Sequence, residues 1–312
     1  MITMGESIHK SVLMKEILDG LAPKSGEIYL DGTLGGGGHA SEVGKLLGKK
    51  GTIIGLDEDA EALERAEKKL SSFKGTRILK NENFRRLDHV LDHVGIREVD
   101  LLLLDLGMSS DQLQSAARGF SFQRDEPLLM TLSSDQKGKN LTASTIVNRF
   151  EEENLRTIIQ SYGEEQFARK IAKRIVERRE EKPIERTLEL VEIIKSAVPG
   201  WYRHRKTHFA TKTFQALRMT VNDELGALIE GLEKGWKHLS IGGRMAVISF
   251  HSLEDRIVKT FFKNKREEGL EPLTKKPIQP SAEEIHGNPR ARSAKLRIVT
   301  KTISKQTSLS HD

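Results

Sequence analysis

The first third of the chain alternates short apolar runs with amphipathic segments. The runs have the length of strands, and the strongest is apolar throughout, which indicates a strand buried on both faces of a parallel sheet. The segments between them place apolar side chains on one face, as helices do. This alternation predicts a doubly wound, Rossmann-like α/β sheet. The predicted strands are Ile28–Asp31, Thr52–Asp57, Arg77–Leu79 and Val99–Asp105.

The alternation stops after Asp105. The next convincing strand is Arg244–Phe250, although a crossover between parallel strands needs only about a dozen residues. The interval shows helical periodicity and no good strand. We therefore predict a discontinuous α/β domain, residues 1–110 and 210–312, with an all-helical insertion at residues 111–209. The insertion leaves the sheet at the carboxyl end of a strand, where open α/β sheets bind ligands, so it is suited to recognising a substrate.

The remaining segments complete the predicted sheet. Apolar residues recur every three or four positions from Phe214 to Trp236, which predicts one long helix packed against the sheet. Ser252 has the position of a helix cap. Residues 270–292 are charged and interrupted by prolines, so we expect a loop there. Leu296–Thr300 alternates as an edge or antiparallel strand would.

Composition narrows the classes of protein. The chain has 312 residues, of which 37% are apolar, which is typical of a protein with a buried core. No apolar run approaches the roughly 18 residues of a membrane span. The absence of cysteine excludes disulfides and thiolate metal sites, and His39, His208 and His251 lack metal-ligand spacing. We expect a cytoplasmic enzyme without a metal or a membrane partner, and its net charge of +6 suits a polyanionic partner.

The stretch Asp31–Ala40, with the sequence DGTLGGGGHA, is the clearest candidate for a binding site. It lies between a predicted strand and a predicted helix, where glycines let the backbone approach a ligand and the helix N-terminus offers free N–H groups. Gly35-x-Gly37-x-x-Ala40 fits the dinucleotide pattern, and Asp57 lies about 20 residues beyond Gly37, where an acid accepts hydrogen bonds from a ribose.

This spacing fits both NAD and S-adenosylmethionine, because both ligands present a ribose. Asp31 favours S-adenosylmethionine, since its carboxylate would repel a pyrophosphate and attract an ammonium or sulfonium group. An NAD-dependent oxidoreductase is the alternative. Asp105 ends the fourth predicted strand at the same edge, and a turn with Ser109 and Ser110 follows it. Phe84, just past the third strand, suits an adenine contact and the core equally well.

Basic residues indicate an RNA substrate. The cations within residues 169–179 suit a solvated helix face, whereas Trp201–His208 (WYRHRKTH) interleaves aromatic and cationic side chains, which suits base stacking and phosphate contacts. Arg290 and Arg292 lie in a second basic loop. The residues by themselves therefore indicate a methyltransferase for a large anionic substrate such as RNA, with a non-catalytic RNA-binding protein as the alternative.

Seven stretches, in order over nearly the whole chain, resemble the bacterial MraW family, which methylates cytidine N4 in small-subunit (16S) ribosomal RNA. The resemblance implies a class I S-adenosylmethionine-dependent methyltransferase fold with an inserted helical domain, and a decoding-centre cytidine as the target. The stretches are DGTLGGGGHA from Asp31, DLGMSSDQL from Asp105, RGFSF from Arg118, YGEEQFARKIAKRIVERR from Tyr162, TFQALRMTVNDEL from Thr213, GGRMAVISFHSLEDRIVKTFF from Gly242 and NPRARSAKLR from Asn288.

The resemblance also implies site residues and partners. The expected partner is 16S ribosomal RNA, with a homodimer as an option. Asp105, Ser109 and Ser110 are the catalytic candidates. The family's cofactor contacts fall on Gly37, Gly38, His39, Asp57, Phe84, Asp105 and Gln112, and the charge of Asp31 adds a further contact. Independently of the resemblance, the predicted RNA contacts are Arg203, Arg205 and Lys206 of the Trp201–His208 stretch, Arg290 and Arg292 of the second basic loop, and Arg218.

The chain departs from the family pattern at three places. Pro127-Leu128 is followed by Leu129–Ser133 (LMTLS), where the family has Asp-Met-Arg-Met-Asp. Residues 208–211 read His-Phe-Ala-Thr in place of His-Pro-Ala-Thr, and Ser11 replaces a proline. We expect the first departure to lie beside the substrate cleft, where it bears on target choice or efficiency.

Overall fold

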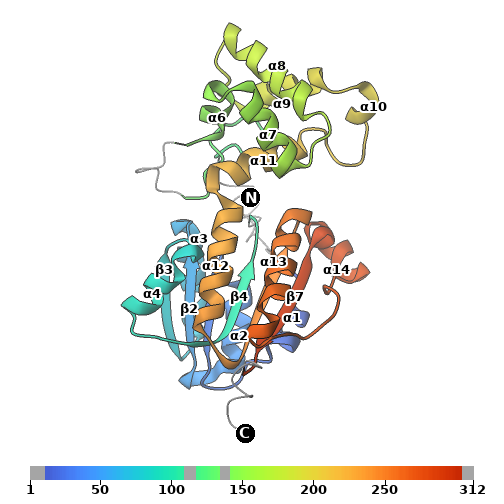
Figure 1. Cartoon of the computed structure of the whole chain (residues 1–312). Helices are drawn as coiled ribbons and strands as arrows, with labels where there is room; N and C mark the ends of the chain where they lie inside the picture. The colour runs from blue at the N-terminus through green and yellow to red at the C-terminus, as the bar shows by residue number, and fades with distance from the viewer. Residues whose placement is uncertain (1–10, 109–116, 134–140, 304–312) are drawn as a thin grey trace. The chain divides into compact units, whose positions relative to one another are not determined.

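The structure is a computed structural model that describes residues 11–108, 117–133 and 141–303. The chain forms two compact units (Figure 1). The first comprises Met1–Gly107 and Leu225–Asp312, and we call it the sheet unit. The second comprises Met108–Glu224, and we call it the helical unit.

The sheet unit is built on seven strands in the order β3-β2-β1-β4-β5-β7-β6. The strands β1 to β5 run parallel to their neighbours among these five, whereas β7 is antiparallel to both β5 and β6. This topology confirms the predicted doubly wound α/β sheet. The strands are β1 (Ile28–Asp31), β2 (Thr52–Asp57), β3 (Thr76–Asn81), β4 (Val99–Asp105), β5 (Leu239–Ser249), β6 (Leu270–Pro272) and β7 (Lys295–Lys301).

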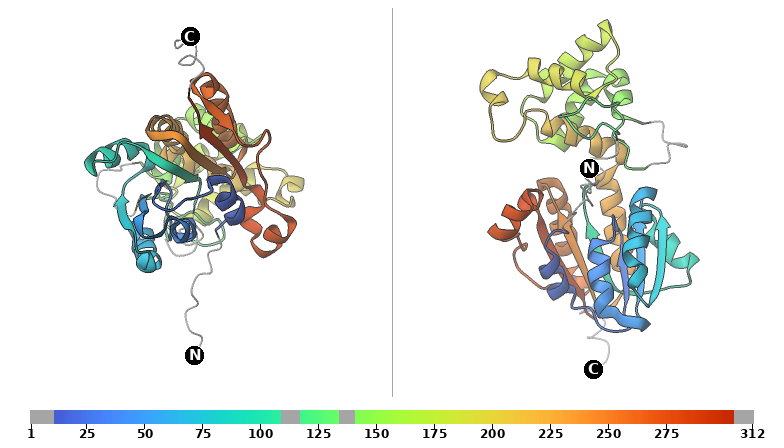
Figure 2. Two further views of the ribbon diagram at one scale, coloured as in Figure 1. Left: turned by 90° about the horizontal axis from the view of Figure 1, so that it is seen from below. Right: turned by 180° about the vertical axis from the view of Figure 1, so that it is seen from behind.

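Helices cover both faces of this sheet, as the two views in Figure 2 show. Leu102 and Leu104 of β4 are buried against one helical layer, and Leu101 and Leu103 are buried against the other, which explains the unbroken apolar run of these four residues. The first layer contains α4 (Leu87–His93), α12 (Glu224–His238) and α13 (Ser252–Asn264). The second contains α1 (Met14–Leu21), α2 (Gly38–Leu47), α3 (Ala60–Lys69) and the short helix η5 (Pro289–Ser293).

Strand register brings three aspartates to one edge of the sheet. Asp31 ends β1 beside Leu103 of β4, Asp57 ends β2, and Asp105 ends β4 beside Ile248 of β5. All three strands are parallel, so their carboxyl ends share the edge at which α/β sheets bind ligands. We call this edge, with Asp31, Asp57 and Asp105, the acidic edge.

The helical unit has a hydrophobic core of its own. Its helices are α6 (Ala143–Arg149), α7 (Glu152–Gly163), α8 (Ala168–Glu181), α9 (Thr187–Ala197), α10 (Gly200–Arg203) and α11 (Thr211–Asn222). The segment Leu129–Ser133 contributes to this core. Met130 is buried and its carbonyl accepts a hydrogen bond from Asn222 Nδ2 at 2.8 Å, while the Leu132 N–H donates to Asn222 Oδ1 at 2.9 Å. The departure from the family pattern is therefore at least partly a matter of packing.

The predicted single helix from Phe214 to Trp236 is wrong. Asp223 adopts a left-handed conformation with φ of 47° and separates α11 from α12. The apolar stripe consequently belongs to two cores, because Phe214, Leu217 and Val221 pack in the helical unit, and Leu228 packs on the sheet.

The insertion also ends later than the sequence indicates. We predicted its end at residue 209, but the helical unit extends to Glu224. The reason is that α11 buries its apolar face in the helical core. At the other end, the unit begins at Met108 rather than at residue 111.

The C-terminal segment is more regular than predicted. Residues 270–292 contain β6, α14 (Ala282–Gly287) and the start of η5, rather than one loop. The last strand is antiparallel, as one of the two predicted options has it, and it lies inside the sheet between β5 and β6. The helix predicted at Ser252 does begin there, but its cap is His251, which forms a capping box with Glu254.

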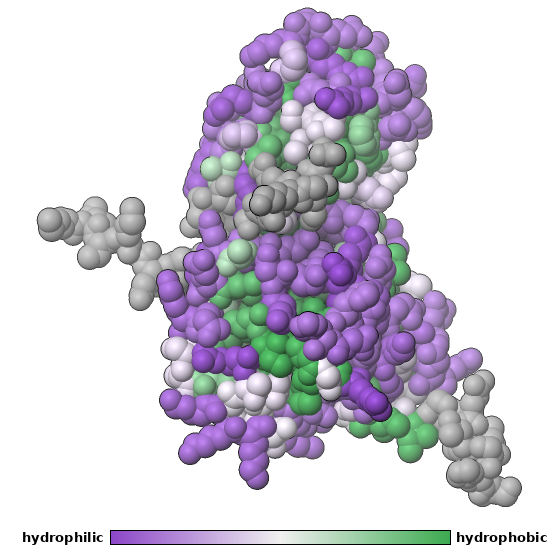
Figure 3. Space-filling view, turned by 90° about the vertical axis from the view of Figure 1, so that its left-hand side faces the viewer, coloured by the Kyte–Doolittle hydropathy of each residue, from purple (hydrophilic) through white to green (hydrophobic). Residues whose placement is uncertain are grey.

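Most of the surface seen in Figure 3 is hydrophilic, with an apolar area near the middle of the sheet unit. Within residues 11–108, 117–133 and 141–303, no helix combines the length and the apolar character needed to cross a membrane.

Candidate active site

The glycine loop joins β1 to α2 at the edge that carries the three aspartates. Gly37 caps α2 with φ of 75°, a conformation that favours glycine. A side chain on Gly38 would overlap the hydroxyl of Ser11, whereas one on Gly36 would meet nothing within 4 Å. The loop is therefore tightly packed against Ser11 at Gly38 and has open space beside Gly36, where a ligand can approach the backbone.

Asp31 is buried below this loop, with 1% of its surface exposed. Its carboxylate accepts hydrogen bonds from the Tyr29 hydroxyl at 2.8 Å and from the Thr33 N–H at 3.2 Å. Burial raises the pKa of Asp31 to about 7, and the charge of Asp57 adds to this rise, although the two hydrogen bonds oppose it. Asp31 is thus held in place, and its carboxyl group is partly protonated near neutral pH.

Asp57 connects the end of β2 to the glycine loop. One carboxylate oxygen accepts from the Gly35 N–H at 2.8 Å, and the other accepts from the Asp59 N–H at 2.9 Å. Burial raises its pKa to about 6. Each carboxylate oxygen has room for a second donor, so Asp57 can fix the loop and accept a hydrogen bond from a ribose at the same time.

Asp105 differs from the other two acids because one of its oxygens lacks a partner. Oδ1 is buried without a hydrogen bond from the described residues, and Oδ2 lies 3.7 Å from His39 Nδ1. The backbone N–H of Asp105 donates to Thr33 Oγ1 at 2.6 Å, which fixes the position of the strand end. Burial, followed by the charges of Asp31 and Glu254, raises the pKa of Asp105 to about 8.

His39 is oriented toward Asp105 by the N-terminal segment. It is buried, and its Nε2 donates a hydrogen bond to the carbonyl oxygen of Val12 at 2.9 Å. A carbonyl oxygen cannot donate, so Nε2 carries a proton and Nδ1 is the atom that faces Asp105. His39, in the first turn of α2, therefore presents its Nδ1 atom to the carboxylate of Asp105.

Three neighbouring acids with raised pKa values need either protons or a positively charged ligand. S-adenosylmethionine fits this requirement, because it carries a sulfonium and an ammonium group. A pyrophosphate does not fit, because it would bring negative charge to the buried carboxyl group of Asp31. The unpartnered Oδ1 of Asp105 also offers an acceptor to a ligand.

Phe84 lies beside this edge at the start of the short helix η3 (Phe84–Arg86). Its Cβ is close to Gly32, and its ring occupies the space that a side chain on Gly231 of α12 would need. Phe84 is half-buried and packs on the core beneath α12. The ring thus borders both the core and the edge of the sheet, and its adenine contact stays a prediction.

The sequence did not single out several residues that shape the site. Tyr29 and Thr33 hold Asp31, and Glu254 contributes to the raised pKa of Asp105. Glu254 is buried, and the N–H groups of Phe250 and His251 donate to its Oε2. A pattern signal existed for Glu254, because it stands three residues after His251, at the spacing of a capping box.

Some of the predicted RNA contacts have side chains that are free of hydrogen-bond partners in the described ranges, whereas Arg203 and Arg218 already hydrogen-bond to other residues of the protein. Lys206 is exposed, and the guanidinium of Arg205 lies 5.4 Å from the ring centroid of Tyr202. Arg203 donates two hydrogen bonds to the carbonyl of Val198, which caps the end of α9. The guanidinium of Arg218 forms a bidentate pair with Glu224 at 2.8 and 2.9 Å. The geometry disfavours an RNA contact by Arg218, because this pair occupies the fork.

Arg290 and Arg292 are both exposed on η5. Lys295, which follows, pairs with Ser249 at the carboxyl end of β5, so η5 lies at the same edge of the sheet as the three aspartates. The remaining candidates Ser109, Ser110 and Gln112 lie outside the described residues. Within the part of the chain that the structure describes, no group of three or more histidine and acidic side chains could hold a metal ion.

Comparisons with known proteins identify the family of the chain. The family model described as the MraW methylase family matches residues 6–302. A Clostridium botulinum protein named Ribosomal RNA small subunit methyltransferase H is 45% identical over 309 residues, with 94% of this chain and 98% of that protein covered. A Kosmotoga olearia protein of the same name is 48% identical over 291 residues, covering 93% and 96%. A solved rRNA methylase from Streptococcus thermophilus is 13% identical with a TM-score of 0.43, covering 96% of this chain and 99% of that one.

The spacing of the glycine loop left NAD and S-adenosylmethionine open as cofactors. The family match favours S-adenosylmethionine, which is also the cofactor that suits the three aspartates. The doubly wound sheet is the class I methyltransferase fold that the resemblance implied. The cofactor is S-adenosylmethionine rather than NAD, and the chain belongs to the MraW methylase family.

Proposed function

We propose that this enzyme methylates the N4 amine of a cytidine in the decoding centre of 16S ribosomal RNA. The observation that carries the proposal is the acidic edge, where Asp31, Asp57 and Asp105 converge on an open glycine loop and Asp105 keeps an unpartnered buried oxygen. Support for the substrate comes from relatives named Ribosomal RNA small subunit methyltransferase H.

The cofactor contacts divide by chemistry. The backbone at Gly37 and Gly38 and the carboxylate of Asp57 are suited to the nucleoside, with Phe84 against the adenine. Asp31 and Asp105 supply the negative charge that a sulfonium and an ammonium group require, and His39 Nδ1 lies 3.7 Å from Asp105 Oδ2. Gln112 is a further proposed contact. When bound, S-adenosylmethionine supplies an electrophilic methyl group.

Asp105 is the proposed catalytic residue. The N4 amine of cytosine is a weak nucleophile because its lone pair is delocalised into the ring, so its N–H groups must be held against acceptors while the methyl carbon lies in line. Oδ1 of Asp105 is an acceptor without a partner among the described residues. The pKa of this carboxyl group is about 8, so its ionised form, which a cationic ligand favours, can also take up a proton near neutral pH. Ser109 and Ser110 are proposed to border the same centre.

The target cytidine must leave its base stack to reach this edge. We propose that the exposed part of the helical unit steadies the RNA. Trp201 is 61% exposed, its ring packs edge-on to Phe167 and Tyr202, and Arg205 and Lys206 follow a few residues later in the chain. Arg290 and Arg292 are the proposed phosphate contacts of the sheet unit.

The test supplies labelled S-adenosylmethionine together with naked 16S RNA, small ribosomal subunits or large ribosomal subunits. Digestion to nucleosides should yield N4-methylcytidine from a small-subunit substrate and none from large subunits. A different methylated nucleoside, or transfer to large subunits, would contradict the proposed target. Binding to small subunits without any transfer would favour the non-catalytic alternative.

Two further expectations follow from this substrate. The enzyme should work in the cytoplasm, where ribosomal subunits are assembled, and it needs no membrane partner. A homodimer stays a prediction, which the mass of the protein in solution at several concentrations would test.

A further inference from the structure

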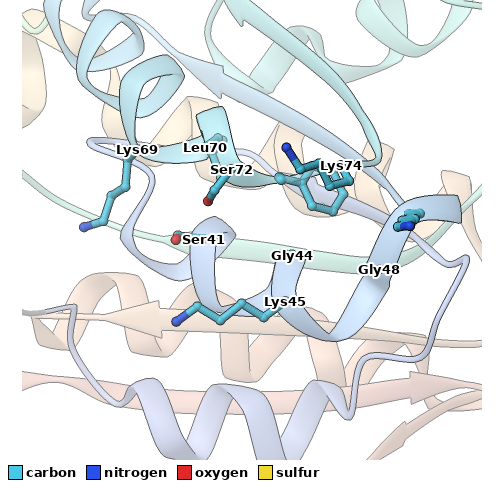
Figure 4. A pocket seen from close by; sticks show the side chains of 10 residues that line it. Ser41, Gly44, Lys45, Gly48, Lys69, Leu70, Ser72 and Lys74 are labelled. Carbon is cyan, nitrogen blue, oxygen red and sulfur yellow. The ribbon is translucent and has the colours of Figure 1, made fainter.

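A groove rich in lysine lies on the sheet unit, away from the acidic edge. Its lining comes from α2, from the short helix η1 (Gly48–Lys50), and from the end of α3 with η2 (Leu70–Ser72) (Figure 4). These segments lead into the first residues of β2 and β3. The groove therefore belongs to the amino end of the parallel strands, opposite the carboxyl ends that carry Asp31, Asp57 and Asp105.

The rim of the groove is positively charged. It carries Lys45, Lys49, Lys69 and Lys74, all of them exposed. Lys45 forms an ion pair with Glu42 at 2.7 Å. The other three make no ion pair or hydrogen bond with any residue of the described ranges. Repulsion between unpaired lysines on one rim costs free energy unless an anion balances it.

The floor is apolar and closely packed. Leu70 is buried, and a side chain on Gly44 would lie 3.2 Å from the Phe73 ring. Figure 4 shows the hydroxyl groups of Ser41 and Ser72 on the same side of the view as the ends of Lys45 and Lys69. These hydroxyls can donate hydrogen bonds to phosphate oxygens.

The lining distinguishes a polyanion from a small free anion. A site for free phosphate normally uses a helix N-terminus or a buried cation. This groove lies at the C-terminal ends of α2 and α3 instead, and the lysines on its rim are exposed. Spaced, exposed lysines suit successive phosphates of a nucleic-acid backbone, because each cation releases counterions from the polymer.

We infer that this lysine-rimmed groove binds the phosphate backbone of an RNA segment distant from the reacting cytidine. The inference rests on the proposed function in taking ribosomal RNA as the substrate. It gives the sheet unit a second RNA contact on the side opposite the cofactor edge, which would hold a large substrate without taking part in methyl transfer.

The test compares the wild type with the triple variant Lys49→Gln/Lys69→Gln/Lys74→Gln. A matched control, Lys237→Gln/Lys259→Gln/Lys263→Gln, removes the same number of exposed lysines from α12 and α13. Affinity for a 16S RNA transcript is measured at several salt concentrations, together with affinity for S-adenosylhomocysteine. The groove variant should bind RNA on the order of tenfold more weakly at low salt, with a salt slope reduced by about two. Its affinity for S-adenosylhomocysteine and its kcat should not change.

RNA affinity within about twofold of the wild type would overturn the inference, and so would an equal loss in the control variant. Inorganic phosphate serves as a separate probe, and saturable binding that the groove variant abolishes would assign the groove to a free anion instead. Absence of methyl transfer by the wild type would count against the proposed function alone, because the binding arm needs no transfer.

Discussion

The acidic edge of the sheet unit differs from the exposed surface formed by Trp201, Arg205 and Lys206 of the helical unit, which we call the Trp201 surface. The first carries negative charge on fixed side chains, and the second carries positive charge on solvated ones. At the edge, Asp31 is buried, Asp57 is half-buried, and each accepts two hydrogen bonds. On the other surface, Trp201 and Lys206 are exposed. A small cofactor is held by a few fixed groups, so the loss of one is costly. RNA is held by many solvated contacts, and each of them is weak and screened by salt.

The largest effect should follow from Asp105→Asn. The asparagine keeps the size of the side chain but cannot ionise or take up a proton. Loss of a group that handles a proton costs on the order of 10²–10⁴-fold in kcat, and we expect a fall of about 10³-fold in single-turnover methyl transfer.

Asp92→Asn is the matched control, because Asp92 is exposed on α4 and its substitution should leave the rate unchanged. Affinity for S-adenosylhomocysteine separates the two roles of Asp105. A rate loss matched by an equal loss of cofactor affinity would assign Asp105 to binding alone, and an unchanged rate would remove it from the site.

The next largest effect should follow from Asp57→Ala. This change removes the acceptor for Gly35 and the proposed contact with the ribose, so calorimetry should show S-adenosylmethionine affinity reduced by at least about 100-fold. Asp57→Asn retains one acceptor oxygen and should lose less. Circular dichroism tests whether both variants fold, and unchanged affinity in a folded Asp57→Ala protein would refute the ribose assignment.

The sequence predicts the acidic edge well for a physical reason. An apolar strand that ends in an acid shows where burial stops, and parallel strands bring such ends to one edge. Asp31, Asp57 and Asp105 could therefore be placed together without any knowledge of their distances. Their hydrogen bonds could not be predicted, because the partners Tyr29, Thr33 and Gly35 are chosen by the turn geometry.

The helical unit was less predictable, because its boundaries depend on packing between distant segments. The periodicity of apolar residues runs unbroken through Asp223, so nothing local marks the left-handed break between α11 and α12. The pairing of Arg218 with Glu224 depends on that break. Arg218 was predicted as an RNA contact, and its pairing could not be foreseen because nothing local in the sequence identifies a partner six positions away.

A smaller effect should appear in the pH dependence of cofactor binding. The folded pKa values of Asp57, Asp31 and Asp105 are about 6, 7 and 8. A cationic ligand favours the ionised carboxylates, so affinity should rise with pH across this window, by about tenfold between pH 6 and 8. Calorimetry in buffers of different ionisation enthalpy should detect proton release near pH 7, and Asp105→Asn should reduce it. Proton uptake would contradict the predicted sign.

The same pKa values determine how stability depends on pH in the protein without cofactor. A carboxyl group whose folded pKa lies above its unfolded value of 3.8 stabilises the fold below that value, and this contribution is lost as pH rises through the folded pKa. Asp105→Asn should therefore raise the melting temperature at pH 8 more than at pH 5. Equal shifts at both pH values would mean that the carboxyl group is not titrating in this window.

The smallest effect should follow from Trp201→Ala, and it tests the other side of the comparison. Trp201 is 61% exposed, so its loss should leave folding intact, while the loss of one stacking contact at the lower end of the usual range, about 1 kcal/mol, should raise KM for RNA about fivefold. Trp201→Phe should retain most of the affinity, because a phenyl ring can still stack. Ile229→Ala is the control, since Ile229 is a 52% exposed apolar residue of the sheet unit. If Trp201→Ala instead lowered kcat as strongly as Asp105→Asn does, an exposed ring on the helical unit would be acting on the chemical step. That result would contradict the distinction between fixed cofactor contacts at the sheet edge and solvated RNA contacts on the helical unit.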